Sequence, residues 1–275
     1  MFSYGSGSAM PVSYLFIDGA SFRHALADIS TFYYEGQELQ VNWARLRGSH
    51  KKVFYYDAIP VQSPDEDGNT YTARVAPKRA ELAAIERQSG YHVKTGDVQR
   101  RRTRGNEQKM VDVQLTVDML QAASRGLFSH CALFTGDLDF RPLITALVEM
   151  GVDVSLYYPL GHTGDELLAA ADNAFPLTLR SISNYLVLSD AQREVVPDAY
   201  SDLQTCEPPP EHAFAKWEDE RHGKCFIADD NGHLRLVAER CPLNPKTHRL
   251  VLRAKKKEHL RLFAENDYGF NVPEW

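Results

Sequence analysis

Short apolar runs that alternate with helical patterns are the feature that most limits how this chain can fold. Ser13–Ile17, Val53–Tyr56, Cys131–Phe134 and Val152–Tyr157 are such runs, and Tyr91–Val93 is a weaker one. Continuous runs of this length, bounded by Gly or Asp, are typical of strands buried on both faces of a parallel sheet. Because strand and helix patterns alternate over about 170 residues, the sequence predicts an α/β fold with a mainly parallel sheet and right-handed crossovers.

Three segments between these runs carry apolar residues at helical spacing. They are Ala73–Gln88, Met110–Ala123 and Phe140–Met150. Gly90 and Gly151 follow two of these segments closely, and glycine commonly stands where a helix ends. The helices are expected to flank the sheet.

The alternation ends near Leu188, and a different pattern follows. Residues 189–211 are polar and include Pro208–Pro210, so a linker is expected there. Short strand patterns follow at Lys224–Ile227, Leu234–Ala238 and Leu250–Arg253, with an Asp-Asp-Asn-Gly hairpin signal at Asp229–Gly232. The expected organisation is a flexible leader over 1–12, an α/β domain over 13–188, a linker over 189–211 and a small β-rich C-terminal module over 212–275.

Charge and composition exclude several classes of protein. The chain has 31 Lys and Arg against 37 Asp and Glu, a formal net charge of −6, which disfavours bulk binding to nucleic acid but permits a local basic patch. No apolar run approaches the roughly 18 residues of a membrane span, and the first ten residues lack a secretory pattern. We therefore expect a cytoplasmic protein with no membrane partner. The four cysteines have no paired spacing and, with His212 and His222, match no standard zinc pattern.

Aspartates follow two of the predicted strands, at the end where open parallel sheets bind ligands. Asp18 ends the first strand, and Asp137 and Asp139 follow the strand at Cys131–Phe134. If the two strands are neighbours, these side chains meet in one crevice, and Asp112 near a helix start adds a fourth. Clustered carboxylates repel one another unless a cation binds, and oxygen-only ligands favour Mg²⁺ or Mn²⁺. Such a site suits an in-line phosphate displacement.

A simpler interpretation is kept beside this one. An Asp after a strand commonly serves as a turn or N-cap residue, so Asp139 could simply cap the helix beginning at Phe140. Asp118 lies on a different face of its helix from Asp112, so either a supporting role or plain exposure to solvent fits it.

Three motifs, in this order, resemble the NYN domain, and within it the LabA-like branch of the PIN-like nuclease superfamily. They are FIDGAS at Phe16–Ser21, KMVDVQLTVDML at Lys109–Leu120 and TGDLDFRP at Thr135–Pro142, and LAAADNAF at Leu168–Phe175 is similar to the closing segment of the family. The resemblance covers Ser13 to about Leu188 and implies a PIN-like fold and a metal-dependent ribonuclease.

The resemblance also implies roles for single residues. Asp18, Asp112, Asp137 and Asp139 match the acidic metal ligands, and Lys109 and Asp118 match frequently shared flanking positions; with Thr135 and Ser21 these are the expected supporting residues. Ser21 stands where the family usually has Asn. A hydroxyl has shorter reach than an amide, so activity could differ.

The substrate is expected to be RNA, in single-stranded segments and cut internally. The densest basic run, with Arg100, Arg101, Arg102 and Arg104, lies before the Asp112 helix and is expected to contact phosphates; the alternative is a solvated loop. A second basic run, Arg253–Lys257 with Arg261, could bind RNA or a partner chain. A homodimer or higher homo-oligomer is expected from the general tendency of such domains.

Two other functions stay open at this point. One is a catalytically weak or inactive RNA-binding or regulatory protein that keeps the acids, for which Ser21 is the warning sign. The other is a metal-dependent phosphohydrolase acting on small phosphoesters. Against the second, Asp18 is followed by Gly and Ala rather than by a second Asp two residues on.

Overall fold

The computed structural model describes residues 12–95, 106–160, 163–203, 209–241 and 248–275. The chain divides into two compact units. The first comprises Met1–Ala25 and Asn42–Pro176, and the second comprises Leu26–Val41 and Leu177–Trp275. Helix α1 (Gly19–Tyr34) begins in the first unit and ends in the second.

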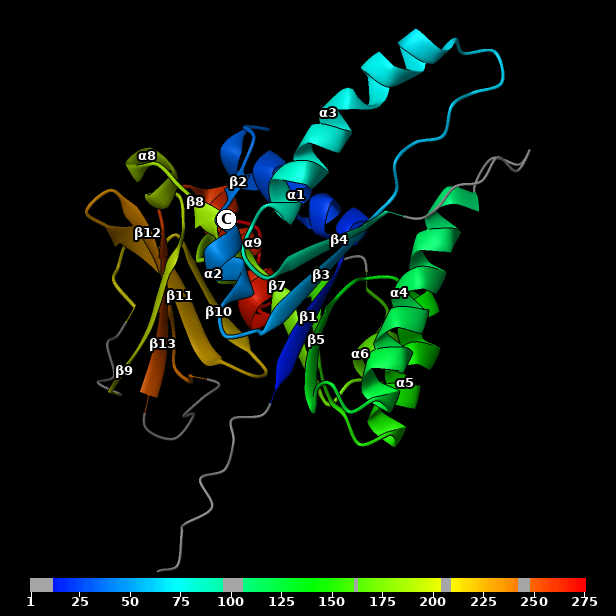
Figure 1. The fold of residues 1–275 in the computed structure, drawn as a ribbon. Helices are drawn as coiled ribbons and strands as arrows, with labels where there is room; N and C mark the ends of the chain where they lie inside the picture. Colours follow the sequence, from blue (N-terminus) through cyan, green and yellow to red (C-terminus); the bar gives the residue numbers. More distant parts are fainter. Residues whose placement is uncertain (1–11, 96–105, 161–162, 204–208, 242–247) are drawn as a thin grey trace, which may run out of the picture. The chain divides into compact units, whose positions relative to one another are not determined.

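A six-stranded sheet forms the centre of the first unit (Figure 1). Its strands are β1 (Ser13–Asp18), β3 (Lys52–Asp57), β4 (Tyr91–Thr95), β5 (His130–Phe134), β6 (Asp153–Pro159) and β7 (Asn173–Leu177). They lie in the order β4-β3-β1-β5-β6-β7, and β1 pairs in parallel with both β3 and β5. After β1, the chain first adds β3 and β4 on one side of it and then β5, β6 and β7 on the other side. The boundary between β1 and β5 is therefore a topological switch point.

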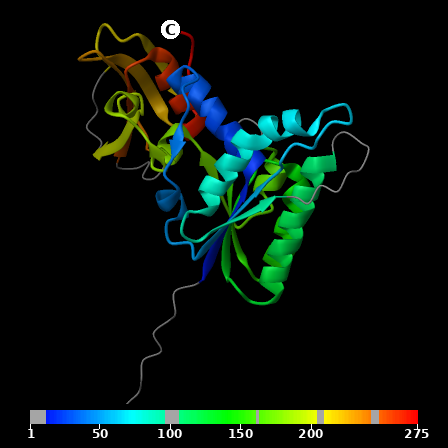
Figure 2. The ribbon, with the colours of Figure 1, turned by 45° about the horizontal axis from the view of Figure 1, so that its top comes forward.

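Helices cover both faces of this sheet. They are α2 (Trp43–Arg47), α3 (Gly68–Glu86), α4 (Asn106–Ser124), the 3₁₀ turn η1 (Leu138–Phe140), α5 (Arg141–Glu149) and α6 (Asp165–Leu168). One core cluster joins Leu115 of α4 and Ile144 of α5 to alternate strand residues such as Phe16 and Leu133. In Figure 2, α3 lies on the opposite side of the strands from α4.

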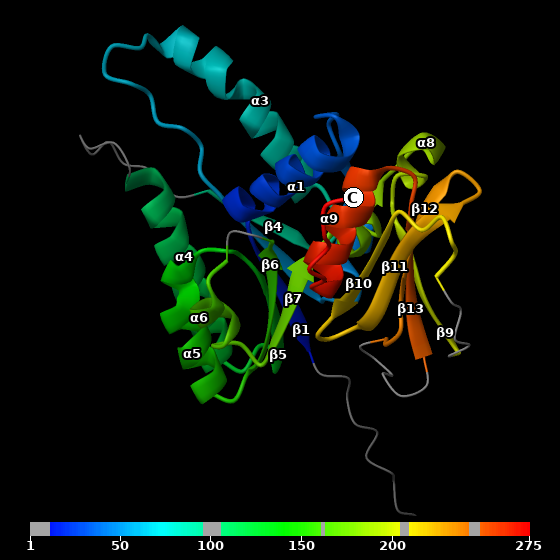
Figure 3. The same cartoon turned by 180° about the vertical axis from the view of Figure 1, so that it is seen from behind.

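The second unit has its own core around an antiparallel sheet (Figure 3). The strand order is β10-β11-β12-β13-β9, with β9 (Asp198–Leu203), β10 (Ala215–Asp219), β11 (Gly223–Asp230), β12 (His233–Ala238) and β13 (His248–Ala254). Helix α9 (Lys257–Tyr268) packs Leu260 and Phe263 against one face. The remaining elements are the pair β2 (Gln40–Val41) and β8 (Leu186–Val187), and the short helices α7 (Leu179–Ser183) and α8 (Asp190–Arg193).

The predicted fold class is confirmed: a mainly parallel sheet flanked by helices, with a β-rich C-terminal sheet. The hairpin signal is also confirmed, because Asn231 and Gly232 both have positive φ, 55° and 81°, between the paired residues Asp230 and His233. Such a two-residue turn needs the left-handed region at both positions.

Part of the expected linker is regular structure instead. Residues 189–211 contain α8 and β9, and β9 pairs along its whole length with β13. Its sequence, DAYSDL, has no apolar alternation. An edge strand is held by backbone hydrogen bonds to one neighbouring strand, so it can form without an apolar face. The domain boundaries proposed from the sequence stay a prediction.

Candidate functional site

The carboxyl ends of β1 and β5 bring the acids of the first and third motifs to one edge of the sheet. Ile17 is the register partner of Phe134, so Asp18 and Thr135 follow on adjacent strands. Asp137 and Asp139 come directly after Thr135-Gly136. This edge is the switch point of the sheet, where open α/β folds bind ligands.

Asp18 is held by four hydrogen bonds although only 7% of it is exposed. Its Oδ1 accepts from the backbone amides of Ala20 at 3.0 Å and Ser21 at 3.3 Å. Its Oδ2 accepts from Ser21 Oγ at 2.6 Å and from Thr135 Oγ1 at 3.0 Å. The first two contacts arise because α1 begins directly after Asp18, so the free amides of its first turn face this carboxylate. These four donors fix the position of the carboxylate.

The two predicted supporting residues Ser21 and Thr135 connect the strand ends. Thr135 is fully buried, and its Oγ1 also accepts from the amide of Asp137 at 3.1 Å. Ser21 Oγ accepts from the amide of Gly136 at 3.3 Å. A serine in place of the usual Asn therefore still reaches both the first acid and the backbone of the third motif.

Asp137 and Asp139 occupy the start of η1. Asp137 is the N-cap, with Oδ1 accepting from the Asp139 amide at 2.9 Å. The N-cap of α5 is Phe140, without a side-chain hydrogen bond. The capping role that the sequence allowed for Asp139 thus belongs to Asp137, and Asp139 is an exposed carboxylate in the first turn.

Asp112, on α4, completes the group. Burial raises its pKa, and the negative charges of Asp18, Asp137 and Asp139 raise it further, to about 7. A charge effect of this kind requires the other three carboxylates to lie nearby, so residues from β1, α4 and the turn after β5 share one electrostatic environment. Acids that are almost a hundred positions apart in the sequence therefore act on one another.

The carboxylate oxygens are ligands that a hard divalent cation prefers. In the described part of the chain, however, they are not arranged as a preformed binding site. Among the residues that the structure describes, no three His, Cys, Asp or Glu side chains converge closely enough to hold a metal ion. Mg²⁺, however, usually keeps several waters and takes only one or two carboxylates from a protein. The charge repulsion around Asp112 is the feature that such an ion would relieve.

Asp118 has structural partners instead of a place among these acids. It accepts hydrogen bonds from Tyr56 Oη at 3.0 Å and from Gln114 Nε2 at 2.7 Å, and Lys94 Nζ lies 4.0 Å away. Burial and the Asp118 charge together raise the pKa of Tyr56, which stays a hydrogen-bond donor. These contacts tie α4 to β3 and β4.

One charged cluster at the same edge has no counterpart in the sequence predictions. Asp57, at the end of β3, is buried and forms ion pairs with Arg23 of α1 and Lys78 of α3. The sequence places Asp57 after a strand, but its two cations lie 34 and 21 positions away, and no spacing rule links them. A buried carboxylate with two cations is already compensated.

The two basic runs noted in the sequence differ in how far the structure describes them. Arg100, Arg101, Arg102 and Arg104 lie outside the described residues, as does the side chain of Lys109. In the second basic run, Lys255 pairs with Glu194, Lys256 with Glu35, and Lys257 lies over the ring of Trp275. Trp43 packs edge-on against Tyr55 and Tyr91. Among the described residues, no helix is long and apolar enough to cross a membrane.

The comparison with protein families identifies the part of the chain that carries the four aspartates. The family model described as "NYN domain" matches residues 13–178. No curated protein matches the chain significantly. A solved structure, a protein of unknown function named VPA0982 from Vibrio parahaemolyticus RIMD 2210633, is 18% identical, with 66% of this chain and 99% of that chain covered and a TM-score of 0.47.

Proposed function

The chain belongs to the NYN domain family, within the PIN-like nuclease superfamily, and we propose on this premise that it is a divalent-metal-dependent ribonuclease. The observation that supports the proposal is that Asp18 and the Asp137–Asp139 turn follow the paired strands β1 and β5. Burial, together with the charges of Asp18, Asp137 and Asp139, raises the pKa of Asp112 to about 7. Carboxylates gathered at a switch point are the arrangement expected of a cation site.

Each of the four aspartates would have its own role in binding the metal ion. Asp18 is fixed by four donors and would hold its charge in a constant position. Asp112 and the exposed Asp139 would supply further ligands, and the N-cap hydrogen bond from the Asp139 amide would orient Asp137. A bound Mg²⁺ or Mn²⁺ would supply Lewis acidity to the attacking water and to the charge on the phosphate.

The substrate proposal rests on the family and on the basic run near Asp112. The positions of Arg100, Arg101, Arg102 and Arg104 precede α4 in the sequence, and their guanidinium groups suit RNA phosphates. We extend the proposal to single-stranded RNA cut internally, in a LabA-like, cytoplasmic protein that can act as a homo-oligomer.

The experiment is cleavage of a labelled single-stranded RNA with Mn²⁺, Mg²⁺ or EDTA. The wild type is expected to give products only with metal, and Asp137→Asn is expected to lose them while its thermal unfolding stays cooperative. Asp190→Asn, on the short helix α8, is the matched control and should cleave like the wild type. Full activity of Asp137→Asn would refute the scheme.

The same assay separates the rival functions. A regulatory RNA-binding protein would bind the RNA with and without Mn²⁺ and yield no product. A small-molecule phosphohydrolase would release phosphate from an aryl phosphate and leave the RNA intact.

A further inference from the structure

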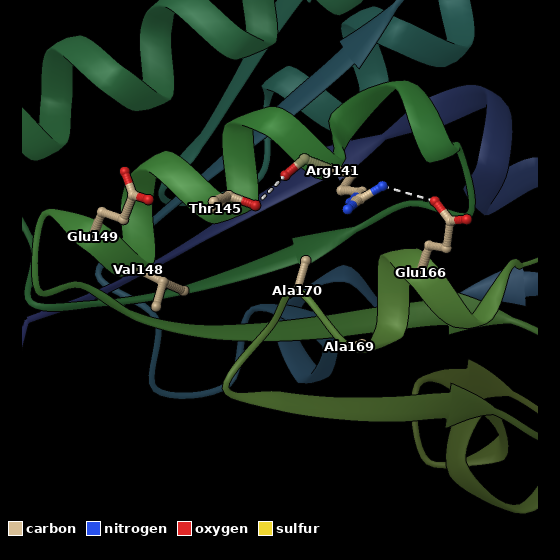
Figure 4. Close-up of a pocket in the computed structure, with 7 residues that line it drawn as sticks. All are labelled: Arg141, Thr145, Val148, Glu149, Glu166, Ala169 and Ala170. Atoms are coloured by element: carbon tan, nitrogen blue, oxygen red, sulfur yellow. Dashed lines mark hydrogen bonds and ion pairs between the residues drawn. The ribbon is translucent and has the colours of Figure 1, made fainter.

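A surface pocket of about 460 Å³ lies between α5 and the segment that follows α6 (Figure 4). Its lining residues are Arg141, Thr145, Val148, Glu149, Glu166, Ala169 and Ala170. The volume falls in the usual range for small-ligand sites. None of the four aspartates belongs to this lining, so the pocket is a feature separate from the acid group.

One end of the pocket nevertheless borders the acids. Arg141 is the first residue of α5 and directly follows η1, so it stands two positions after Asp139. Helix α6, which carries Glu166, packs against η1. Glu149 marks the far end, eight residues along α5, or about 12 Å at the rise of an α-helix. The pocket therefore runs away from the carboxyl edge of the sheet.

The end of the pocket next to η1 carries a cation, Arg141, that can bind a phosphate group. Arg141 Nη1 lies 2.7 Å from Glu166 Oε2, and the side chains are 53% and 67% exposed. Figure 4 shows the two side chains pointing toward each other. An exposed pair of this kind contributes little stability, so Arg141 can exchange Glu166 for a phosphate group, which guanidinium binds through paired hydrogen bonds.

The rest of the pocket suits a planar ring with polar edges. Ala169, Ala170 and Val148 present small apolar side chains, against which a flat ring can lie. Thr145 Oγ1 donates to the backbone oxygen of Arg141 at 3.1 Å, and the Glu149 carboxylate can accept from N–H groups. Glu149 and Glu166 in the lining repel a phosphate group. A phosphate that is joined to a base gains contacts from the base that offset this repulsion, so the pocket favours a nucleotide over a phosphate alone.

We propose that this pocket binds one nucleotide of the RNA next to the cleaved phosphodiester, with its phosphate at Arg141 and its base over Ala169 and Ala170. The inference rests on the proposed nuclease function for its role in cleavage. It assigns a substrate contact to the described part of the chain, independent of the basic run at Arg100–Arg104.

The test fills the pocket and leaves the acids in place. Ala170→Trp is expected to lower kcat/KM for single-stranded RNA at least tenfold in Mn²⁺, while the rise in melting temperature caused by Mn²⁺ is retained. Ala76→Trp, at an exposed position of α3, is the matched control and should stay within twofold of the wild type. Should Ala170→Trp unfold, Thr145→Trp, on the exposed side of α5, replaces it.

A second measurement keeps the pocket distinct from the catalytic proposal. Guanosine 5′-monophosphate and adenosine 5′-monophosphate are titrated without metal into the wild type and Ala170→Trp, with inorganic phosphate in parallel. Saturable nucleotide binding to the wild type, lost in Ala170→Trp, supports the pocket even if no RNA is cleaved, a result that would overturn only the proposed function. Wild-type cleavage by Ala170→Trp, or equal binding of phosphate and nucleotides, overturns the inference.

Discussion

Thr135 Oγ1 donates a hydrogen bond to Asp18 Oδ2 at 3.0 Å and so joins the carboxyl ends of β5 and β1. The hydroxyl is fully buried and also accepts from the amide of Asp137. One side chain thus sets the position of the first acid of the candidate site and the path of the backbone into the next two. This double role leads to the first prediction.

Thr135→Val keeps the shape of the side chain and removes both hydrogen bonds. Because a hydrogen bond to a charged group contributes about 1.5–3 kcal/mol, and the Asp137 amide also loses its acceptor, we expect the free energy of unfolding to fall by about 2 kcal/mol. Urea unfolding measures this loss. Thr135→Ser, which retains the hydroxyl, is the control and should lose less; equal stability of Thr135→Val and the wild type would contradict the assigned role.

Asp112 gives the second prediction, which concerns pH. Its pKa in the folded protein is about 7, against 3.8 as the ordinary value. The folded state therefore binds more protons than the unfolded state between these values, and the contribution of Asp112 to stability is complete below pH 3.8 and is lost as pH rises through 7. In EDTA, Asp112→Asn should thus gain melting temperature relative to the wild type at pH 8 and gain less at pH 5.

Metal supplies the control for this prediction. Mn²⁺ should raise the melting temperature of the wild type at pH 8, because an ion that binds the folded state relieves the same repulsion. Asp112→Asn should respond less. A difference between the two proteins that is the same at pH 5 and pH 8 would show that the charge of Asp112 is not the cause.

Local sequence patterns predicted five of the six strands of the parallel sheet, all except β7, and they place aspartates directly after β1 and β5. The metal-binding role of those aspartates stays a prediction. Buried parallel strands need continuous apolar runs, and the switch point puts whatever follows β1 and β5 at one edge. Helix α1 also left a signal that the prediction missed: Phe22, Ala25, Ile29 and Tyr33 are buried at helical spacing.

Other features depend on contacts that no local pattern encodes. β9 is a polar edge strand, and only its pairing with β13 reveals it. The hydrogen bond from Tyr56 to Asp118 joins positions 62 residues apart, so the sequence could not decide between a supporting and a solvated Asp118. That contact allows a direct test of the two roles.

Asp118 is the subject of the third prediction. Asp118→Asn weakens the acceptor of Tyr56 and Gln114, and Tyr56→Phe removes one of the donors. Each should lower the free energy of unfolding by about 1–2 kcal/mol, and the double variant should lose less than the sum, since both changes break the same contact. RNA cleavage by Asp118→Asn should stay within a few fold of the wild type at a temperature where both are folded. Loss of cleavage without loss of stability would place Asp118 among the catalytic acids instead.

The last prediction concerns a histidine pair at the opposite edge of the sheet. Ser13 Oγ lies 2.7 Å from Nδ1 of His50 and 2.7 Å from Nδ1 of His130, so its one hydroxyl serves both rings. A single hydroxyl can donate to only one of them, and the other ring must donate to it.

Burial, together with the neighbouring His130, lowers the pKa of His50 to about 4 from an ordinary value of 6.5. The unfolded state therefore takes up a proton before the folded state does, and the contribution of His50 to stability is complete above pH 6.5 and is lost as pH falls through 4. His50→Asn keeps a polar group near Ser13 and removes the titration. The stability difference between wild type and His50→Asn, measured by urea unfolding, should shrink from pH 7.5 to pH 4.5. His212→Asn, at an exposed position, is the control for replacing a histidine elsewhere in the chain. A wild-type difference for His50→Asn that is the same at pH 7.5 and pH 4.5 would contradict the assigned role of His50.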